Sequence, residues 1–142
     1  ADLSRANLSG ADLSGADLFR ADLSRANLSG AKNAPPLALA QTEIVPREGA
    51  FIAWKKGLGD ALVQLRIPES AARSNATGRK CRAEFVEVLE VIGGPAISIY
   101  DGKTEYVAGQ TVRCDNWNPD RFIECGGGIH FYLTREEAEA HV

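Results

Sequence analysis

The sequence has 142 residues, enough for one domain but not comfortably for two. Its 16 Lys and Arg residues against 19 Asp and Glu residues give a formal net charge of −3, and this weak acidity argues against a general nucleic-acid-binding protein. Hydrophobic residues make up 44% of the chain and charged residues 25%, which excludes a disordered protein. No apolar run approaches the roughly 18–20 residues that span a bilayer. The sequence contains no methionine, so we expect it to be a piece of a longer protein.

The first thirty residues are six consecutive five-residue units with the pattern Ala-[Asp/Asn]-Leu-x-x. A period of five fits neither the 3.6-residue period of an α-helix nor the two-residue period of a strand. Leucines five residues apart would spiral around a helix without forming an apolar stripe. A solenoid in which each unit turns a corner returns every Leu to the interior, so the repeat predicts a coiled β structure.

On this pattern the segment resembles the pentapeptide-repeat family. The resemblance implies a right-handed quadrilateral β-helix with one unit on each side, its Leu and Ala side chains inside and its Asp, Asn, Ser and Arg side chains outside. Six units would make one and a half coils. Both ends of such a stub would present unpaired backbone groups, which invite pairing with another chain.

The remainder of the chain predicts a small α+β domain. Pro35 and Pro36 stop the repeat, and β-branched and aromatic residues then recur between Gly and Pro punctuation. The expected strands are 50–54, 61–67, 81–92, 96–100, 104–108, 110–113 and 129–133. Thr134 and Glu137 have the spacing of a capping box, which predicts a C-terminal helix to about residue 141.

Three strings in this domain also resemble a known pattern: Gly-Arg-Lys-Cys-Arg-Ala-Glu at 78–84, Gly-Gln-Thr-Val at 109–112 and Glu-Cys-Gly-Gly-Gly-Ile-His-Phe at 124–131. With them the domain is similar to a C-terminal module that follows pentapeptide repeats in bacterial and bacteriophage proteins. The resemblance implies an architecture and no activity. Three cysteines are an odd number and favour reduced thiols, so we expect a cytoplasmic location in a bacterial cell or an association with a virion.

Cys125 and His130 are the sharpest catalytic candidates. A thiol and an imidazole close in space could act as a nucleophile and its base, and the neighbouring glycines could offer N–H groups to an oxyanion. The alternative is a tight glycine turn into a buried strand, with Cys125 as a small core residue and His130 facing away from the core. Cys81, Cys114, Cys125 and His130 suit zinc by type, but their spacing argues against a metal site.

A basic loop supplies the candidate ligand-binding site. Arg79, Lys80 and Arg82 could hold a phosphate or another anion, together with the backbone of Gly126, Gly127 and Gly128 if the two loops meet. The alternative is a solvated loop that balances nearby glutamates.

We therefore predict a mainly β protein with three parts: a β-helix stub at 1–31, a linker or cap at 32–49, and a small α+β domain at 50–142. The leading hypothesis is a non-enzymatic structural or protein-interaction module. The alternatives are a binding module for a small phosphorylated ligand and a cysteine-dependent self-processing enzyme around Cys125 and His130. We expect no cofactor, metal, nucleic acid or membrane. The expected partner is a protein or a second copy, bound through the β-helix ends.

Truncating an inward Leu tests the repeat assignment. We expect Leu13→Ala or Leu18→Ala to destabilise the chain by about 2–5 kcal/mol, because a buried Leu loses its packing. Ser14→Ala on the outer face should change stability by less than about 0.5 kcal/mol. Denaturant unfolding measures both, and equal effects would contradict the inward placement of Leu.

Overall fold

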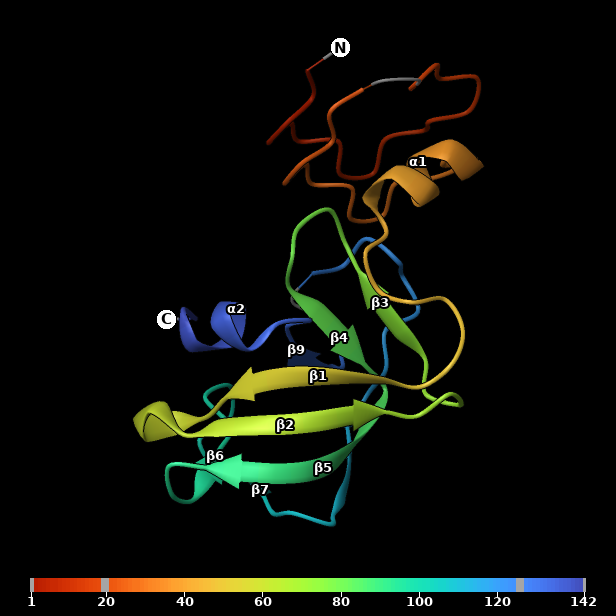
Figure 1. Cartoon of the computed structure of the whole chain (residues 1–142). Coiled ribbons are helices and arrows are strands. Elements are labelled where there is room, and N and C mark those ends of the chain that lie inside the picture. Colours follow the sequence, from red (N-terminus) through yellow and green to blue (C-terminus); the bar gives the residue numbers. More distant parts are fainter. Residues whose placement is uncertain (1, 19–20, 125–126, 142) are drawn as a thin grey trace.

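The computed structural model describes residues 2–18, 21–124 and 127–141. Within these residues the chain is mainly β, with antiparallel sheets and two short α-helices. Figure 1 shows the repeat segment at one end of the molecule, helix α1 (Pro36–Thr42) next to it, and the sheets of the remaining chain beyond. No helix in the described part of the chain is long and apolar enough to cross a membrane.

Residues twenty positions apart pair in parallel within the repeat segment. The bridges join Asp2 to Asp22, Asn7 to Asn27 and Asp12 to Lys32. The leucine that follows each first partner donates its N–H to the carbonyl of the second partner, at 2.8 Å in all three cases. A step of twenty residues is four units of five, so the first coil of the chain lies on the second.

The leucines of the repeat point into the coil. Leu23 and Leu28 are only 4% and 1% exposed, and Leu13 and Leu18 are also buried. Leu3 and Leu8, in the first coil, are half-buried. The interior is therefore best covered in the second coil, which lies between the first coil and the rest of the protein (Figure 1).

The Asp or Asn at the second position of each described unit stabilises the turn that follows it. The side-chain oxygen of Asp2, Asn7, Asp12, Asp22 and Asn27 accepts the N–H of the Ser two residues later, at 2.9–3.1 Å. Such Asx turns stabilise a change of chain direction. Hydrogen bonds from Ser4 and Ser24 lower the pKa of Asp2 and Asp22, respectively.

Helix α1 lies within the segment predicted as a linker or cap. Pro36 stands in its first turn, where a missing N–H costs little. Ala38 is fully buried against Leu18 and Leu23. The Thr42 hydroxyl donates to the Ala38 carbonyl at 2.8 Å. A single apolar face of this short helix thus packs on the interior of the coil.

We call the described part of the chain from residue 50 onward the head. Its sheets are antiparallel throughout. One has the order β1-β2-β5-β8, from strands Phe51–Lys56, Leu62–Ile67, Phe85–Ile92 and Thr111–Arg113. A second has the order β3-β4-β9, from Arg73–Asn75, Cys81–Ala83 and Ile129–Phe131. A third pairs β6 (Ala96–Ile97) with β7 (Glu105–Tyr106). Between β1 and β2 lies a 3₁₀ turn at Leu58–Asp60.

The segment 81–92 was expected to be one strand and is two, which belong to different sheets. Between them, Glu84 donates its N–H to the Ala72 carbonyl and accepts the N–H of Cys114. Ala72 directly precedes β3 and Cys114 directly follows β8. Glu84 therefore bonds toward one sheet through its N–H and toward the other through its carbonyl, and the chain changes sheets at this residue. A second link joins the two sheets where Trp54 and Tyr132 exchange backbone hydrogen bonds of 2.9 and 2.8 Å.

The main core of the head lies between these sheets. Its largest fully buried members come from β2, β5 and β9, and they are Val63, Leu65, Ile67, Val86, Val88 and Phe131. Helix α2 (Arg135–Glu139) follows β9 and buries Ala138. The Thr134 hydroxyl accepts the Glu137 N–H at 3.3 Å, which confirms the predicted N-cap.

Asn75 ties the end of β3 to the segment after α1. Its side-chain oxygen accepts from the N–H groups of Ile44 and Val45 at 2.9 and 3.3 Å, and its amide donates to the Thr42 carbonyl at 2.7 Å. The residue is 1% exposed. Each of these buried backbone groups would lose a partner if the amide were removed.

We therefore expect Asn75→Ala to lower the free energy of unfolding by roughly 2–4 kcal/mol, because several buried polar groups become unsatisfied. Asn116→Ala, at an exposed position of the same residue type, should cost less than about 0.5 kcal/mol. Urea unfolding of the two variants makes the comparison, and similar losses would argue that Asn75 has no special role.

Candidate functional site

At the junction between the repeat and the head, side chains and backbone groups of the head and of α1 form hydrogen bonds with the backbone of the repeat. The Thr77 hydroxyl donates to the Ala26 carbonyl at 2.5 Å, and the Thr77 carbonyl accepts the Arg25 N–H at 3.4 Å. Gln41 of α1 donates to the Leu18 carbonyl at 3.2 Å, and the Asp120 carboxylate accepts the Gly30 N–H at 2.9 Å. We call this surface the covered coil end.

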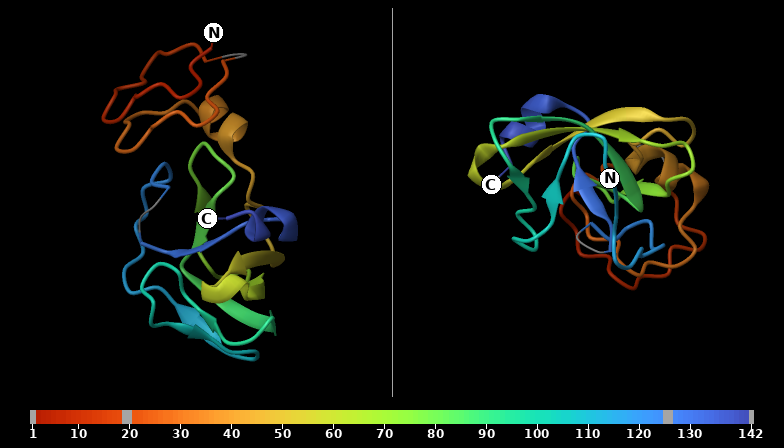
Figure 2. Two further views of the ribbon diagram at one scale, coloured as in Figure 1. Left: turned by 90° about the vertical axis from the view of Figure 1, so that its left-hand side faces the viewer. Right: turned by 90° about the horizontal axis from the view of Figure 1, so that it is seen from below.

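Apolar contacts complete the junction. Phe122 is 5% exposed and packs with Leu13 and Leu28, while Ala38 of α1 packs with Leu18 and Leu23. Figure 2 shows α1 and the loop between β3 and β4 lying between the coil and the head. The end of the apolar interior is therefore closed by side chains from three separate segments of the head and its connection.

Arg121 holds two of these segments together. Its guanidinium donates to the carbonyl oxygens of Asn75 and Ala76, to the Leu39 carbonyl at 3.3 Å and to the Thr42 hydroxyl at 2.9 Å. Burial lowers the pKa of Arg121. Since a guanidinium offers five donors in one plane, it can satisfy acceptors of α1 and β3 at once.

The opposite face of the first coil differs from the covered end. Asn27 of the second coil bonds to the first coil through both of its backbone groups. Its N–H donates to the Ala6 carbonyl and its carbonyl accepts the Leu8 N–H, at 2.8 Å each. The equivalent groups of Asn7 and Asp12 point away from the second coil, and within the described residues they have no backbone partner. We call these groups the open coil face.

The predicted anion site does not assemble around Arg82. Arg82 is 1% exposed, and its guanidinium donates to the carbonyls of Ile123 (2.8 Å), Asn118 (2.6 Å), Gly127 (2.9 Å) and Asp120. It also stacks on Trp117, 4.5 Å from the ring centroid. Four carbonyl oxygens solvate the buried charge, so Arg82 holds residues 118–123 next to Gly127.

The glycines of the predicted site have a steric role. A Cβ at Gly127 would lie 1.5 Å from the Asn116 carbonyl oxygen, and one at Gly128 would lie 3.0 Å from Cβ of Arg82. The close approach of the backbone to these neighbours therefore requires glycine at 127. Gly126 and Cys125 lie outside the described residues.

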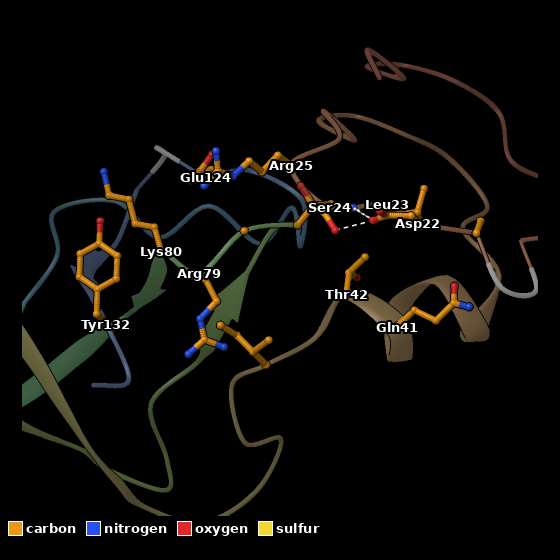
Figure 3. A pocket seen from close by; sticks show the side chains of 14 residues that line it. Asp22, Leu23, Ser24, Arg25, Gln41, Thr42, Arg79, Lys80, Glu124 and Tyr132 are labelled. Atoms are coloured by element: carbon orange, nitrogen blue, oxygen red, sulfur yellow. Dashed lines mark hydrogen bonds between the residues drawn. The ribbon is translucent and has the colours of Figure 1, made fainter. Parts of the chain in front are cut away.

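Arg79 and Lys80 face the space between the repeat and the head. They line a cavity of about 620 Å³ with residues that include Ser24, Arg25, Thr42 and Glu124 (Figure 3). Arg79 is paired with Glu137 of α2 through bonds of 2.8 and 2.9 Å. This bidentate pair raises the pKa of Arg79 and lowers that of Glu137.

His130 takes the orientation that the strand alternation predicts. Ile129 and Phe131 are buried in the core, whereas His130 lies on the other side of β9 and its Nε2 is 3.1 Å from the Glu124 carbonyl. Burial, and then the charges of Lys80 and Lys55, lower the pKa of His130 to about 4. The imidazole is therefore neutral at physiological pH.

The two described thiols are poor nucleophiles. Burial raises the pKa of Cys81 to about 12 and also raises the pKa of Cys114. The reactive form of cysteine is the thiolate, which these shifts suppress at neutral pH. No group of three or more His, Cys, Asp or Glu side chains suited to a metal ion occurs among the residues that the structure describes.

A second pocket, of about 270 Å³, gathers basic residues that the sequence did not mark as a group. We call it the basic pocket, and its polar lining is Lys55, Lys56, Lys80, Tyr100, His130, Tyr132 and His141. Lys80 was a sequence candidate for anion binding, and His130 for catalysis. Lys55 and Lys56 lie beyond the predicted strand 50–54 but form the end of β1, and His141 follows α2.

The twenty-residue register and its inward leucines define the class of the N-terminal segment: it consists of pentapeptide repeats. The family model for pentapeptide repeats, described as eight copies, matches residues 1–32. The model of DUF5758, a family of unknown function, matches residues 41–138, and the chain belongs to that family. No curated protein and no solved structure matches the chain.

The lowered pKa of His130 makes stability depend on pH. As the pH falls from about 6.5 towards 4, His130 becomes protonated in the unfolded chain but stays neutral in the folded protein. The free energy of unfolding therefore decreases over this pH range. We expect His130→Gln to remove this loss, because glutamine does not titrate. Urea unfolding at pH 7 and pH 4.5 measures the effect, and an NMR titration of the His130 ring with a midpoint near 6.5 would contradict it.

Proposed function

We propose that the protein is a non-enzymatic structural module in which the DUF5758 domain caps a right-handed quadrilateral β-helix and forms a small α+β head at its end. The twenty-residue parallel register supports four sides per coil. The buried leucines support a continuous apolar interior. The observation that carries the proposal is the covered coil end.

Capping answers a physical need of repeat proteins. The last coil of a solenoid exposes an apolar interior and unpaired backbone groups, and terminal elements with a polar outer surface keep it from aggregating. Here Thr77 and Asp120 hydrogen-bond backbone groups of the second coil, and Gln41 bonds to the Leu18 carbonyl at the end of the first. Phe122 and Ala38 cover leucines of both coils. The connection through α1 and Arg121 makes this cap part of the folded head.

The open coil face is the interaction surface in this proposal. Its Asn7 and Asp12 backbone groups have the register of the ladder below them, and Leu3 and Leu8 beneath are half-buried. A coil with the same five-residue spacing can continue the ladder there. In this proposal a second copy supplies such a coil when the chain is studied alone.

A non-enzymatic role agrees with the chemistry of the described candidates. The thiols of Cys81 and Cys114 have raised pKa values, and Nε2 of His130 contacts the Glu124 carbonyl. The enzyme hypothesis would need Cys125, which lies outside the described residues.

Hydrogen exchange combined with sedimentation tests the proposal. We expect a monomer–dimer equilibrium at high micromolar concentration, with slower amide exchange at Asn7 and Asp12 as the dimer forms. The Leu8 and Leu13 amides already donate to the second coil, so they serve as internal controls that stay protected at every concentration. A strict monomer whose Asn7 and Asp12 amides exchange freely would overturn the self-association. Fast exchange at Arg25 and Gly30, whose N–H groups bond to the head, would overturn the cap.

A further inference from the structure

The basic pocket is built from segments that are far apart in the sequence. Lys55 and Lys56 come from the end of β1, Lys80 immediately precedes β4, and His130 lies in β9. Tyr100 follows β6, and His141 follows α2. A run of like charges along one segment would be an ordinary solvated face, but here the fold brings separate basic groups to one cavity.

Lys55 is the innermost charge of this cavity. Its ammonium donates to the His130 carbonyl at 2.9 Å and lies 5.7 Å from the ring centroid of Tyr106. Burial, followed by repulsion from Lys80, lowers the pKa of Lys55 to about 8. The group is thus charged at neutral pH, although its surroundings disfavour the charge.

The other basic groups lie close enough to repel one another. Lys80 and Lys55 both lower the pKa of His130 and that of His141, after burial as the main cause, and Lys56 also acts on His141. Like charges gathered in a partly desolvated cavity cost free energy unless an opposite charge joins them.

The acidic groups near the pocket lie at its edge. Asp60 forms an ion pair of 3.1 Å with Lys56, but its side chain is 87% exposed. Asp101 acts on Lys55 electrostatically, while its carboxylate accepts from the N–H groups of Lys103 and Thr104 and from the Thr104 hydroxyl. Among the described residues that line the cavity, the charged side chains are those of lysines, and neither Asp60 nor Asp101 is one of the lining residues.

We propose that the basic pocket binds the phosphoryl group of a small soluble phosphate compound, with Lys55, Lys80 and His130 around the anion. The ammonium groups of Lys55 and Lys80 suit phosphate oxygens and repel metal cations. A cavity of about 270 Å³ admits a pyrophosphate or a small phosphate ester. This site is distinct from the one expected around Arg82, whose donors are used by the carbonyls of residues 118, 120, 123 and 127.

The surroundings of the pocket add apolar and aromatic surface to this charge. Ile99, which is 38% exposed, is part of the lining. The Tyr100 ring is 89% exposed and lies 6.5 Å from the His130 ring, centroid to centroid. An exposed aromatic ring next to a phosphate site offers a stacking surface to an organic group attached to the phosphate.

Calorimetric titration of the full chain with inorganic pyrophosphate, at about 0.15 M salt to screen non-specific attraction, tests the proposal. We expect saturable binding with a Kd below roughly 1 mM, and a loss of roughly tenfold or more in Lys80→Gln, because a charge-assisted contact disappears. Lys32→Gln makes the same chemical change at an exposed site on the repeat and should bind like the parent chain. Lys55→Met is the stronger variant, but it could fail to fold, so Lys80→Gln decides.

A second readout reports on the site itself. The charges of Lys55, Lys80 and Arg82 lower the pKa of His130. A bound anion next to the ring favours its protonated form and opposes this effect. Pyrophosphate should therefore raise the pKa of His130, which an NMR titration measures. No saturable heat up to about 10 mM pyrophosphate, equal losses in Lys80→Gln and Lys32→Gln, or an unmoved His130 titration would each overturn the proposal. Because the repeat takes no part in the pocket, failure here would leave the capping role untouched.

Discussion

The covered coil end is the constraint on which the arrangement of the chain depends. A β-coil cannot stop inside a folded protein without partners for its last N–H and carbonyl groups, since each unpaired buried group costs free energy comparable to a lost hydrogen bond. In this protein Thr77, Gln41 and Asp120 supply those partners, from three different places in the sequence. The positions of α1, the loop before β4 and the loop after β8 follow from that requirement.

The same requirement explains why buried polar side chains gather near the junction. Asn75 and Arg121 each bond to several backbone groups, and both reach the segment of α1 and its end. Within the described residues, no buried side-chain nitrogen or oxygen is left without a hydrogen bond. The junction is thus polar in composition but fully satisfied, which gives it a defined geometry that a purely apolar contact would not impose.

The sequence predicted those elements that are determined by neighbouring residues and missed those that depend on contacts between distant parts of the chain. The five-residue period and the Thr134–Glu137 spacing are local, and both predicted the observed elements. The division of 81–92 into two strands was missed because Glu84 is set by Ala72 and Cys114, which lie far away along the chain. The basic pocket was missed for the same reason: Lys55 and His141 become neighbours only after the sheets have formed. Arg82 was misjudged because a cation in a polar sequence resembles a surface residue until its carbonyl partners are known.

The way in which Arg82 is held has a consequence for the tolerance of this protein to sequence change. Its partners are main-chain carbonyls, which every amino acid possesses, rather than particular carboxylates. Exchanging a side chain among residues 118–123 therefore leaves these carbonyl acceptors in place, although Asp120, Arg121 and Phe122 also contact the repeat or α1 through their side chains. Asp115 and Asn116, which precede this segment and are exposed, tolerate substitution more readily, while the buried guanidinium fixes the positions of the carbonyls at 118, 120, 123 and 127.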